Sequence, residues 1–232
     1  MRQLYIGNKN YSSWSMRPWV LMTQAGIGFD EVPLRFDSFE ADSAFKRAIG
    51  PLNPTGQVPL LVDDGLAVWD SLAIAEYLAE TCPEAQLWPA DRAQRARARC
   101  LCAEMHSGFG ALRSACGMNV EADLAHQGAL IWRDNPRVRA DVARIVSMWS
   151  ELLGEHAARH ADGMLFGRFS IADAYFAPVV IRLTRYALPV PANVAAYLQR
   201  VQALPGVRAW VDGALAEHDF IAHEEPYRVA GS

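Results

Sequence analysis

The stretch from Leu52 to Leu78, LNPTGQVPLLVDDGLAVWDSLAIAEYL, decides the fold of this chain. Its run from Val58 to Val62 is short and almost wholly apolar, which is typical of a strand buried on both faces. Asp63-Asp64-Gly65 is then typical of a hairpin turn, because glycine supplies the positive φ that such turns require. Leu66 to Trp69 returns as the second strand. The stretch therefore predicts a loop and a β-hairpin that leads into a helix.

The helix after the hairpin begins at Asp70 or Ser71, because either residue is a preferred N-cap. Its apolar positions recur at helical spacing, at Leu72, Ala75, Leu78 and Ala79. The sequence thus places an acid and a hydroxyl at a helix N-terminus, where unpaired backbone N–H groups stabilise anions. An N-cap pair without any ligand is the alternative interpretation.

Pro59 is the unusual residue of the first strand, because a proline donates no hydrogen bond to a ladder and belongs at a strand start, an edge or a bulge. Two conformations satisfy this constraint. A trans bond would simply initiate the strand, whereas a cis Val58–Pro59 bond would turn the N–H and C=O of Val58 outward, free to pair with an extended peptide. The sequence leaves both open, since only about 5–6% of X–Pro bonds in folded proteins are cis.

The motifs NPTGQVPLLVDDG and WDSLAIAEYL resemble the glutathione-binding half of the cytosolic glutathione S-transferases, and the resemblance covers nearly the whole chain. It implies that Gln57 and Val58, before a cis Pro59, meet the cysteinyl part of glutathione. It also implies that Asp70 and Ser71 hold the γ-glutamyl end, with Asp70 facing the ammonium.

The N-terminal part has the element order βαβαββα. Gln3 to Gly7 is a short strand, and Pro18 fits the first turn of a helix that Gly26 ends. Val32, Leu34 and Phe36 alternate as a strand that Pro33 makes an edge strand, and a short helix or loop surrounds Phe45. Residues 1–80 are therefore predicted to form a thioredoxin-like α+β domain, with a proline-containing linker at 81–91.

Residues 92–232 carry no strand signal and are predicted to form an all-α domain, a helical bundle. Ser170 and Asp173 match a capping box that opens one of its helices. The predicted helices are Arg92 to Ala115, Val120 to Trp132, Val138 to His160, Ile171 to Leu188, Ala192 to Ala203 and Val207 to His218.

The composition excludes several classes of protein. A chain of 232 residues, 51% of them hydrophobic, is long enough to bury a substantial core in one or two domains. Its net charge of -4 argues against nucleic acid as the main partner, and it lacks the roughly 18 uninterrupted apolar residues of a membrane span. Four cysteines make no disulfide framework, and the N-terminus lacks the apolar core of a signal peptide. We predict a cytoplasmic protein with reduced thiols.

The segment from Ser12 to Arg17 carries the candidate chemistry. Ser12 and Ser13 lie at a predicted helix N-terminus, where a hydroxyl donor and the helix dipole both favour a thiolate, and Arg17 adds a positive charge. Helix capping alone is the alternative role of the serines. The pattern resembles the Ser-Ser-Cys-Ser-x-Arg signature of the zeta class, which includes maleylacetoacetate isomerases. By that match Ser12 activates the thiol, while Trp14 stands where zeta proteins have cysteine and belongs to the glutathione site.

The resemblance also implies contacts outside these motifs. Lys46 corresponds in position to residues that meet the glycyl carboxylate. The acceptor substrate is expected against Met105, His106 and Phe109. Arg185 falls where zeta isomerases keep an arginine for a substrate carboxylate, with Arg182 beside it on the same face.

The leading hypothesis is a glutathione S-transferase that conjugates the glutathione thiolate to a small electrophile. One alternative is glutathione-dependent cis–trans isomerisation of a maleylacetoacetate-type diacid. A further alternative is a non-catalytic binding or regulatory protein on the same fold. The family implies a homodimer. Glutathione is the expected co-substrate and no metal is expected, because His156 and His160 are the i, i+4 pair with metal-ligand spacing and they lack a third ligand.

Overall fold

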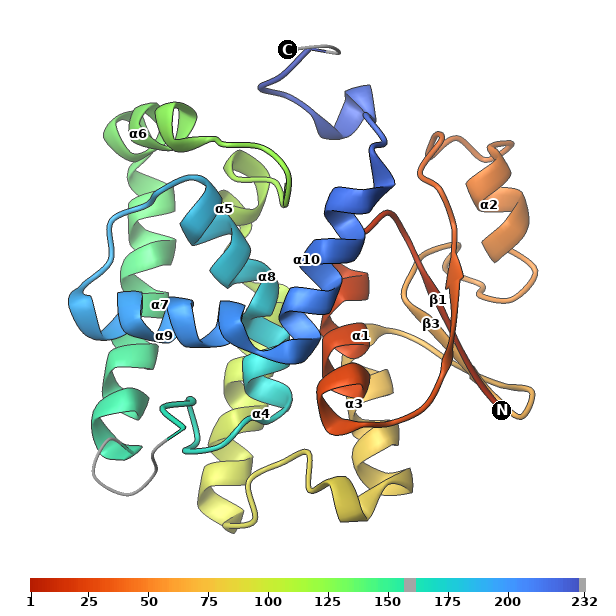
Figure 1. Cartoon of the computed structure of the whole chain (residues 1–232), viewed down its shortest axis with the longest axis horizontal. Helices are drawn as coiled ribbons and strands as arrows, with labels where there is room; N and C mark the ends of the chain where they lie inside the picture. The colour runs from red at the N-terminus through yellow and green to blue at the C-terminus, as the bar shows by residue number, and fades with distance from the viewer. Residues whose placement is uncertain (157–161, 230–232) are drawn as a thin grey trace.

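A four-stranded mixed sheet and a layer of helices lie side by side in the computed structural model, which describes residues 1–156 and 162–229 (Figure 1). The strands are β1 (Arg2–Ile6), β2 (Asp30–Pro33), β3 (Leu60–Asp63) and β4 (Leu66–Val68). Their order is β2-β1-β3-β4, with β1 parallel to β2 and antiparallel to β3. The edge position predicted for the strand with Pro33 is confirmed, although β2 ends at Pro33 instead of continuing to Phe36.

The predicted hairpin is confirmed. Leu61 of β3 faces Val68 of β4, and the turn uses positive φ at both central residues, 48° at Asp64 and 88° at Gly65. β3 begins at Leu60 and not at Val58, because Pro59 has no N–H to contribute to the ladder. The Val58–Pro59 peptide bond is cis, and the Trp69–Asp70 bond after β4 is also cis.

Two of the helix ends predicted for the N-terminal domain are confirmed, the C-terminus of the first helix at Gly26 and the N-terminus of the helix after the hairpin at Asp70. α1 (Ser13–Ala25) ends at Gly26, which adopts a left-handed conformation with φ 69°. α3 (Ser71–Thr81) is capped by Asp70, whose Oδ1 accepts the N–H of Leu72 at 3.0 Å. The short α2 (Ala44–Ile49) is capped by the Ser43 hydroxyl. Two N-termini, those of α1 and α3, therefore flank the loop that leads into β3.

The remaining elements are helical and follow a 3₁₀ turn, η1 (Pro83–Ala85). They are α4 (Arg92–Ser107), α5 (Gly110–Ala115), α6 (Ala125–Asp134), α7 (Pro136–His156), α8 (Ile171–Arg185), α9 (Ala192–Ala203), α10 (Pro205–Glu217) and the 3₁₀ turn η2 (Ala222–Glu224).

The predicted helix from Arg92 to Ala115 is in fact two helices. Phe109 between α4 and α5 adopts a left-handed conformation with φ 55°, which an unbroken helix does not allow. The helix predicted from Val120 begins only at Ala125. In the loop before it, backbone N–H groups donate to side chains instead of to backbone carbonyl oxygens of a helix. His160, the predicted end of α7, lies outside the described residues.

The capping box at the start of α8 is confirmed and is fully buried. The Asp173 carboxylate accepts the backbone N–H groups of Ser170 and Leu165 and the hydroxyl of Tyr197. Burial raises the pKa of Asp173 to about 6, although these hydrogen bonds oppose the shift. The box therefore fixes the start of α8 inside the core.

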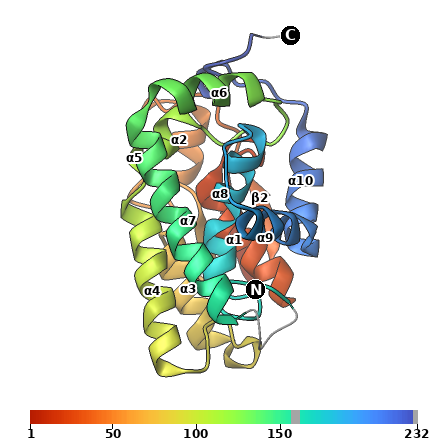
Figure 2. The ribbon, with the colours of Figure 1, turned by 90° about the vertical axis from the view of Figure 1, so that its left-hand side faces the viewer.

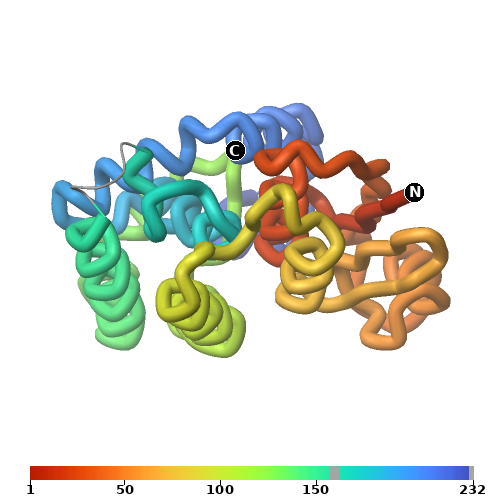
Figure 3. The backbone as a smooth tube through the Cα atoms, turned by 90° about the horizontal axis from the view of Figure 1, so that it is seen from below, coloured from red at the N-terminus to blue at the C-terminus, as the bar shows by residue number. Residues whose placement is uncertain are grey.

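α1 and α8 pack against each other and join the two domains. α8 lies in the middle of the helical layer and is buried along almost its whole length (Figure 2). α1 also packs against α10, and α3 packs beside α4, as the view from below shows (Figure 3). One core cluster therefore runs through both domains. Among the described residues, no helix has the length and apolar character needed to cross a bilayer.

Gly128 and Gly154 lie inside helices with different surroundings. A Cβ at Gly128 would lie 1.8 Å from the carbonyl oxygen of Tyr186, whereas one at Gly154 would meet nothing within 4 Å. We expect Gly128→Ala to lower the free energy of unfolding by about 1–3 kcal/mol through overpacking. Gly154→Ala should raise it by roughly 0.5–1 kcal/mol through helix propensity. Urea titration followed by circular dichroism checks both, and equal stability of the two variants would contradict this packing.

Candidate active site

A cleft with a volume of about 1090 Å³ lies between the two domains. The N-terminus of α1, the loop before β3 and the start of α3 form one side. The end of α4, the loop after α5, α8 and η2 form the other. Among the residues predicted from the sequence, those that line the cleft are Ser12, Ser13, Trp14, Lys46, Gln57, Val58, Pro59, Asp70 and His106.

Five predicted residues lie outside this lining. Arg17, Ser71, Met105 and Phe109 are buried in the core, and Arg185 lies near the last turn of α8. These helices thus turn one face to the cleft and use another face to pack the two domains together.

The two serines have different partners. Ser12, the N-cap of α1, is 5% exposed, and its hydroxyl donates to the Ser15 hydroxyl at 2.7 Å instead of capping the helix. Ser13 begins the helix, and its hydroxyl accepts a hydrogen bond from Nη2 of Arg182 at 3.2 Å. Ser12 therefore has a neutral hydrogen-bond partner, whereas Ser13 accepts a hydrogen bond from a guanidinium of the other domain.

Trp14 lies among cationic and aromatic side chains. The guanidinium of Arg17 lies 4.1 Å from its ring centroid and that of Arg113 lies 4.9 Å away. The ring of His106 meets Trp14 edge to face at 5.1 Å. Arg17 is also 4.2 Å from the ring of Tyr175, so it lies behind the cleft and not beside the serines. Burial lowers the pKa of Arg17 to about 10.

Two side chains bind carbonyl oxygens of the loop before β3, one from the loop itself and one from α2. Asn53, which is 1% exposed, donates from Nδ2 to the carbonyl oxygen of Gln57 at 2.8 Å. Lys46 donates from Nζ to the carbonyl oxygen of Gly56 at 2.8 Å. The β1–β3 ladder starts with the pair of Tyr5 and Leu60, so Val58 precedes it and its backbone faces the cleft outside the sheet pairing.

The start of α3 is tied to the helical domain. One oxygen of the Asp70 carboxylate lies 3.2 Å from Nε2 of His106 on α4. Nδ1 of His106 lies 2.8 Å from the hydroxyl of Tyr175, and that hydroxyl lies 3.0 Å from the hydroxyl of Ser71. The Ser71 side chain is thus turned into the domain interface, while Asp70 faces the cleft.

Two arginines line the opposite wall. Arg182 donates to the carbonyl oxygen of Cys116 and to Ser13, and Arg113 donates to carbonyl oxygens of the α4–α5 junction. In the described part of the chain, neither forms an ion pair with a carboxylate. Burial and the neighbouring arginines lower the pKa of Arg182 to about 10. Arg113 and Arg182 therefore bring positive charge to this wall, and Glu224 of η2 brings a carboxylate to the same cleft lining.

Family models match both domains. Residues 11–81 match the glutathione S-transferase N-terminal domain, and residues 119–213 match the glutathione S-transferase C-terminal domain. The chain belongs to the glutathione S-transferase family.

Named relatives agree with this assignment. The chain is 31% identical to glutathione S-transferase GstA of Escherichia coli over 68% of this chain and 73% of that protein. It is 27% identical to maleylacetoacetate isomerase of Rattus norvegicus over 79% of this chain and 78% of that protein. A solved Burkholderia glutathione transferase homologue with bound glutathione is 27% identical, with a TM-score of 0.66, over 93% of this chain and 98% of that one.

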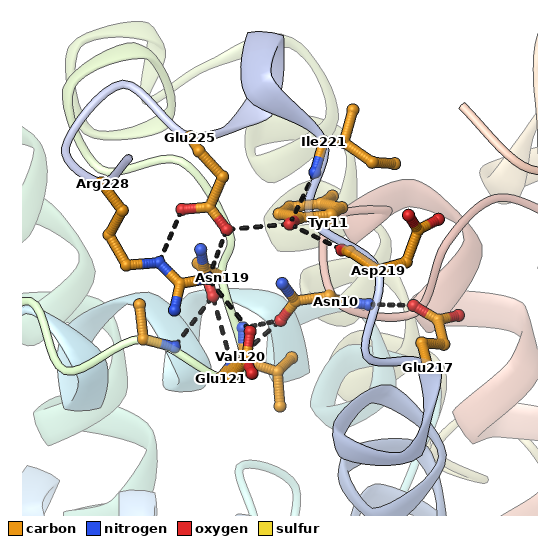
Figure 4. A network of polar contacts seen from close by, with 11 residues as sticks. Asn10, Tyr11, Asn119, Val120, Glu121, Glu217, Asp219, Ile221, Glu225 and Arg228 are labelled. Atoms are coloured by element: carbon orange, nitrogen blue, oxygen red, sulfur yellow. Dashed lines mark hydrogen bonds and ion pairs between the residues drawn. The ribbon is translucent and has the colours of Figure 1, made fainter. Parts of the chain in front are cut away.

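The C-terminal segment, residues 218–229, forms part of the cleft wall of this glutathione S-transferase. The Tyr11 hydroxyl donates to the Glu225 carboxylate at 2.8 Å and accepts the N–H of Ile221 at 3.3 Å (Figure 4). Arg228 binds both Glu225 and Glu121. Burial, with Glu225 beside it, raises the pKa of Tyr11 to about 12. The residue before Ser12 is therefore fixed by the far end of the chain.

The sequence interpretation missed several residues of the cleft. Asn53 organises the loop before β3, and the motif NPTG, in which an asparagine precedes a turn, is the local signal for it. Arg113 and Glu224 carried no comparable signal, because both reach the cleft only through tertiary packing. Arg182 takes the wall position at which Arg185 had been expected.

Tyr11→Phe should loosen the C-terminal segment, because the amide of Ile221 loses its acceptor and Glu225 loses its donor. We expect amide hydrogen exchange at Ile221 to accelerate up to about tenfold, the equivalent of one hydrogen bond. Tyr227→Phe is the matched control, since that hydroxyl binds the carbonyl oxygen of Ala115 instead. Equal exchange rates at Ile221 in both variants would contradict the anchoring role of Tyr11.

Proposed function

We propose that this protein binds glutathione in the cleft and transfers its thiolate to a small electrophile, with Ser12 stabilising the thiolate. One observation carries the proposal: the cleft brings together the Ser12 hydroxyl, the unpaired backbone of Val58 and the Asp70 carboxylate. A thiolate that accepts a hydrogen bond, an extended peptide and an ammonium group are the parts of glutathione that these three groups suit.

Two charged residues of the cleft lining support this orientation. Lys46 lies at the loop before β3 and suits the glycyl carboxylate, while Asp70 at the start of α3 suits the γ-glutamyl ammonium. Val58 lies between them in the chain and suits the cysteinyl backbone, as an added strand would pair. The sulfur would then face the N-terminus of α1.

The N-terminus of α1 offers the thiolate a hydroxyl donor and a positive dipole end. A free thiol has a pKa of about 8.5, and lowering it by about two units requires roughly 2.7 kcal/mol of preferential stabilisation. In the proposed reaction the sulfur lone pair forms a bond to an electrophilic carbon, and the leaving group departs with its electron pair.

Ser12→Ala tests the role of the hydroxyl. We expect the rate with a chloronitrobenzene to fall roughly 25-fold at neutral pH, because a rise in the pKa of bound glutathione from about 6.5 to about 8.5 leaves about 3% thiolate instead of about 76%. The rate of the unaltered enzyme should reach its plateau at a lower pH than the rate of the variant. The ultraviolet absorbance of the thiolate, recorded against pH, measures the shift directly.

Ser13→Ala is the matched variant, since Ser13 holds Arg182. Its thiol pKa should stay close to that of the unaltered enzyme. If the pKa of bound glutathione instead rose only in Ser13→Ala, the residue that stabilises the thiolate would be Ser13 and not Ser12.

The cationic wall favours a second candidate function, cis–trans isomerisation of a maleylacetoacetate-type diacid. In that reaction the thiolate adds to the double bond, the new single bond rotates, and elimination of the thiol restores the double bond. Arg113 and Arg182 have no carboxylate partner in the described part of the chain and suit the carboxylates of such an acceptor.

Arg113→Gln separates this candidate from simple conjugation. We expect the KM for maleylacetone to rise about tenfold while turnover of a chloronitrobenzene changes little, because only maleylacetone carries a carboxylate that would lose a charge-assisted hydrogen bond. Arg185→Gln is the matched control and should leave both activities unchanged, since Arg185 lies outside the cleft lining. Loss of isomerisation in Arg185→Gln alone would instead restore the assignment drawn from the resemblance.

A binding or regulatory role remains the third candidate. Retention on immobilised glutathione without turnover of either substrate would support it over both reactions. We further propose a cytoplasmic homodimer, which the resemblance implies. Its thiols Cys82, Cys100, Cys102 and Cys116 are all unbridged in the structure.

A further inference from the structure

We propose that His106 is a positioning residue for glutathione: it orients the Asp70 carboxylate toward the ammonium group of the γ-glutamyl unit and thereby joins the helical domain to that subsite. This inference rests on the proposed glutathione-binding function. The observation behind it is a chain of contacts that runs from Asp70 through His106 and Tyr175 to Ser71.

The Asp70 carboxylate is held by two groups from different domains. Its Oδ1 accepts the N–H of Leu72 in its own helix at 3.0 Å, and its Oδ2 lies 3.2 Å from Nε2 of His106 on α4. Its side chain nevertheless remains 53% exposed and lines the cleft. A carboxylate offers about four lone-pair directions. Two are taken by these neighbours, and the others face the cleft, where a cation can reach them.

Proton placement makes His106 a donor in this chain of contacts. An ionised carboxylate only accepts hydrogen bonds, so a hydrogen bond across the 3.2 Å between Nε2 of His106 and Asp70 requires the hydrogen on Nε2. In the neutral ring Nδ1 then accepts the hydrogen of Tyr175, and the Tyr175 oxygen accepts that of Ser71. Burial raises the pKa of Tyr175, which keeps that hydroxyl protonated. Each donor in the chain thus has an acceptor.

The ring of His106 is fixed from its other sides as well. Trp14 meets it edge to face at 5.1 Å, and the ring of Tyr175 stacks on it at 6.4 Å. Arg113 donates to its backbone carbonyl oxygen. Because the side chain is only 28% exposed, the Nε2–H vector has little freedom. A fixed N–H donor of this kind holds the carboxylate in one orientation. It does not take the place of the cation that the carboxylate is to bind.

His106→Leu and His106→Gln test the proposal by calorimetric titration of the full chain. The two ligands are glutathione and glutaryl-cysteinyl-glycine, an analogue that lacks only the α-amino group. We expect the leucine variant to raise the Kd for glutathione about tenfold, the low end for a hydrogen bond to a charged group. The Kd for the analogue should stay unchanged. The glutamine variant should recover much of the loss, because its amide retains an N–H donor.

His126→Leu, at an exposed position on α6, controls for replacement of a histidine by an apolar residue, and thermal unfolding checks that each variant folds. Equal losses for glutathione and the analogue would overturn the proposal and make His106 a packing residue only. Tighter glutathione binding in His106→Leu would overturn it too, because His106 would then compete with the ammonium. If the unaltered protein binds neither ligand, the proposed function itself fails, which is a different result from either of these.

Discussion

Helix α1 is packed on two sides, and this double packing is the constraint on which the site depends. One side faces β1 and α3 of its own domain, and the other faces α8 and α10. The turn that carries Ser12 and Ser13 therefore opens only onto the space between the domains. A shift of α8 by one turn, about 5.4 Å along its axis, would take Arg182 away from Ser13 and remove the cationic wall. The cleft is thus a product of helix packing and not of loop conformation alone.

Two buried arginines make this packing specific. Burying a guanidinium without a carboxylate is costly, and the lowered pKa values of Arg17 and Arg182 express that cost. Arg17 offsets part of it by lying between the rings of Trp14 and Tyr175, which belong to different domains. Arg182 does so through the Cys116 carbonyl oxygen and Ser13. If the domains separated, Arg17 would lose its contact with Tyr175 and Arg182 its hydrogen bond to Ser13, so each favours one docking arrangement.

Local sequence patterns predicted much of the fold because their causes are local. The turn at Asp64-Gly65 needs positive φ, the N-cap at Asp70 needs a side-chain acceptor, and the box at Asp173 needs an acid three residues after Ser170. All three patterns depend on neighbours within a few residues. The split between α4 and α5 escaped prediction although Gly108 and Gly110 flank Phe109, because single glycines are tolerated inside a helix and phenylalanine rarely adopts a left-handed conformation.

The parts of the site that depend on distant residues escaped prediction for the same reason. Arg182 and Arg185 lie three positions apart on α8, and their directions differ by only about 60°, so counting from a motif does not decide which of them meets Ser13. Nor does the C-terminal segment show an apolar repeat; it is held by the Tyr11 hydroxyl and by ion pairs. Because Tyr11 directly precedes Ser12, the last described residues of the chain fix the backbone beside the hydroxyl that is proposed to meet the sulfur. The N-terminal motifs identify which residue types form the site. The geometry of the site is set by the residues of the other domain that pack against them.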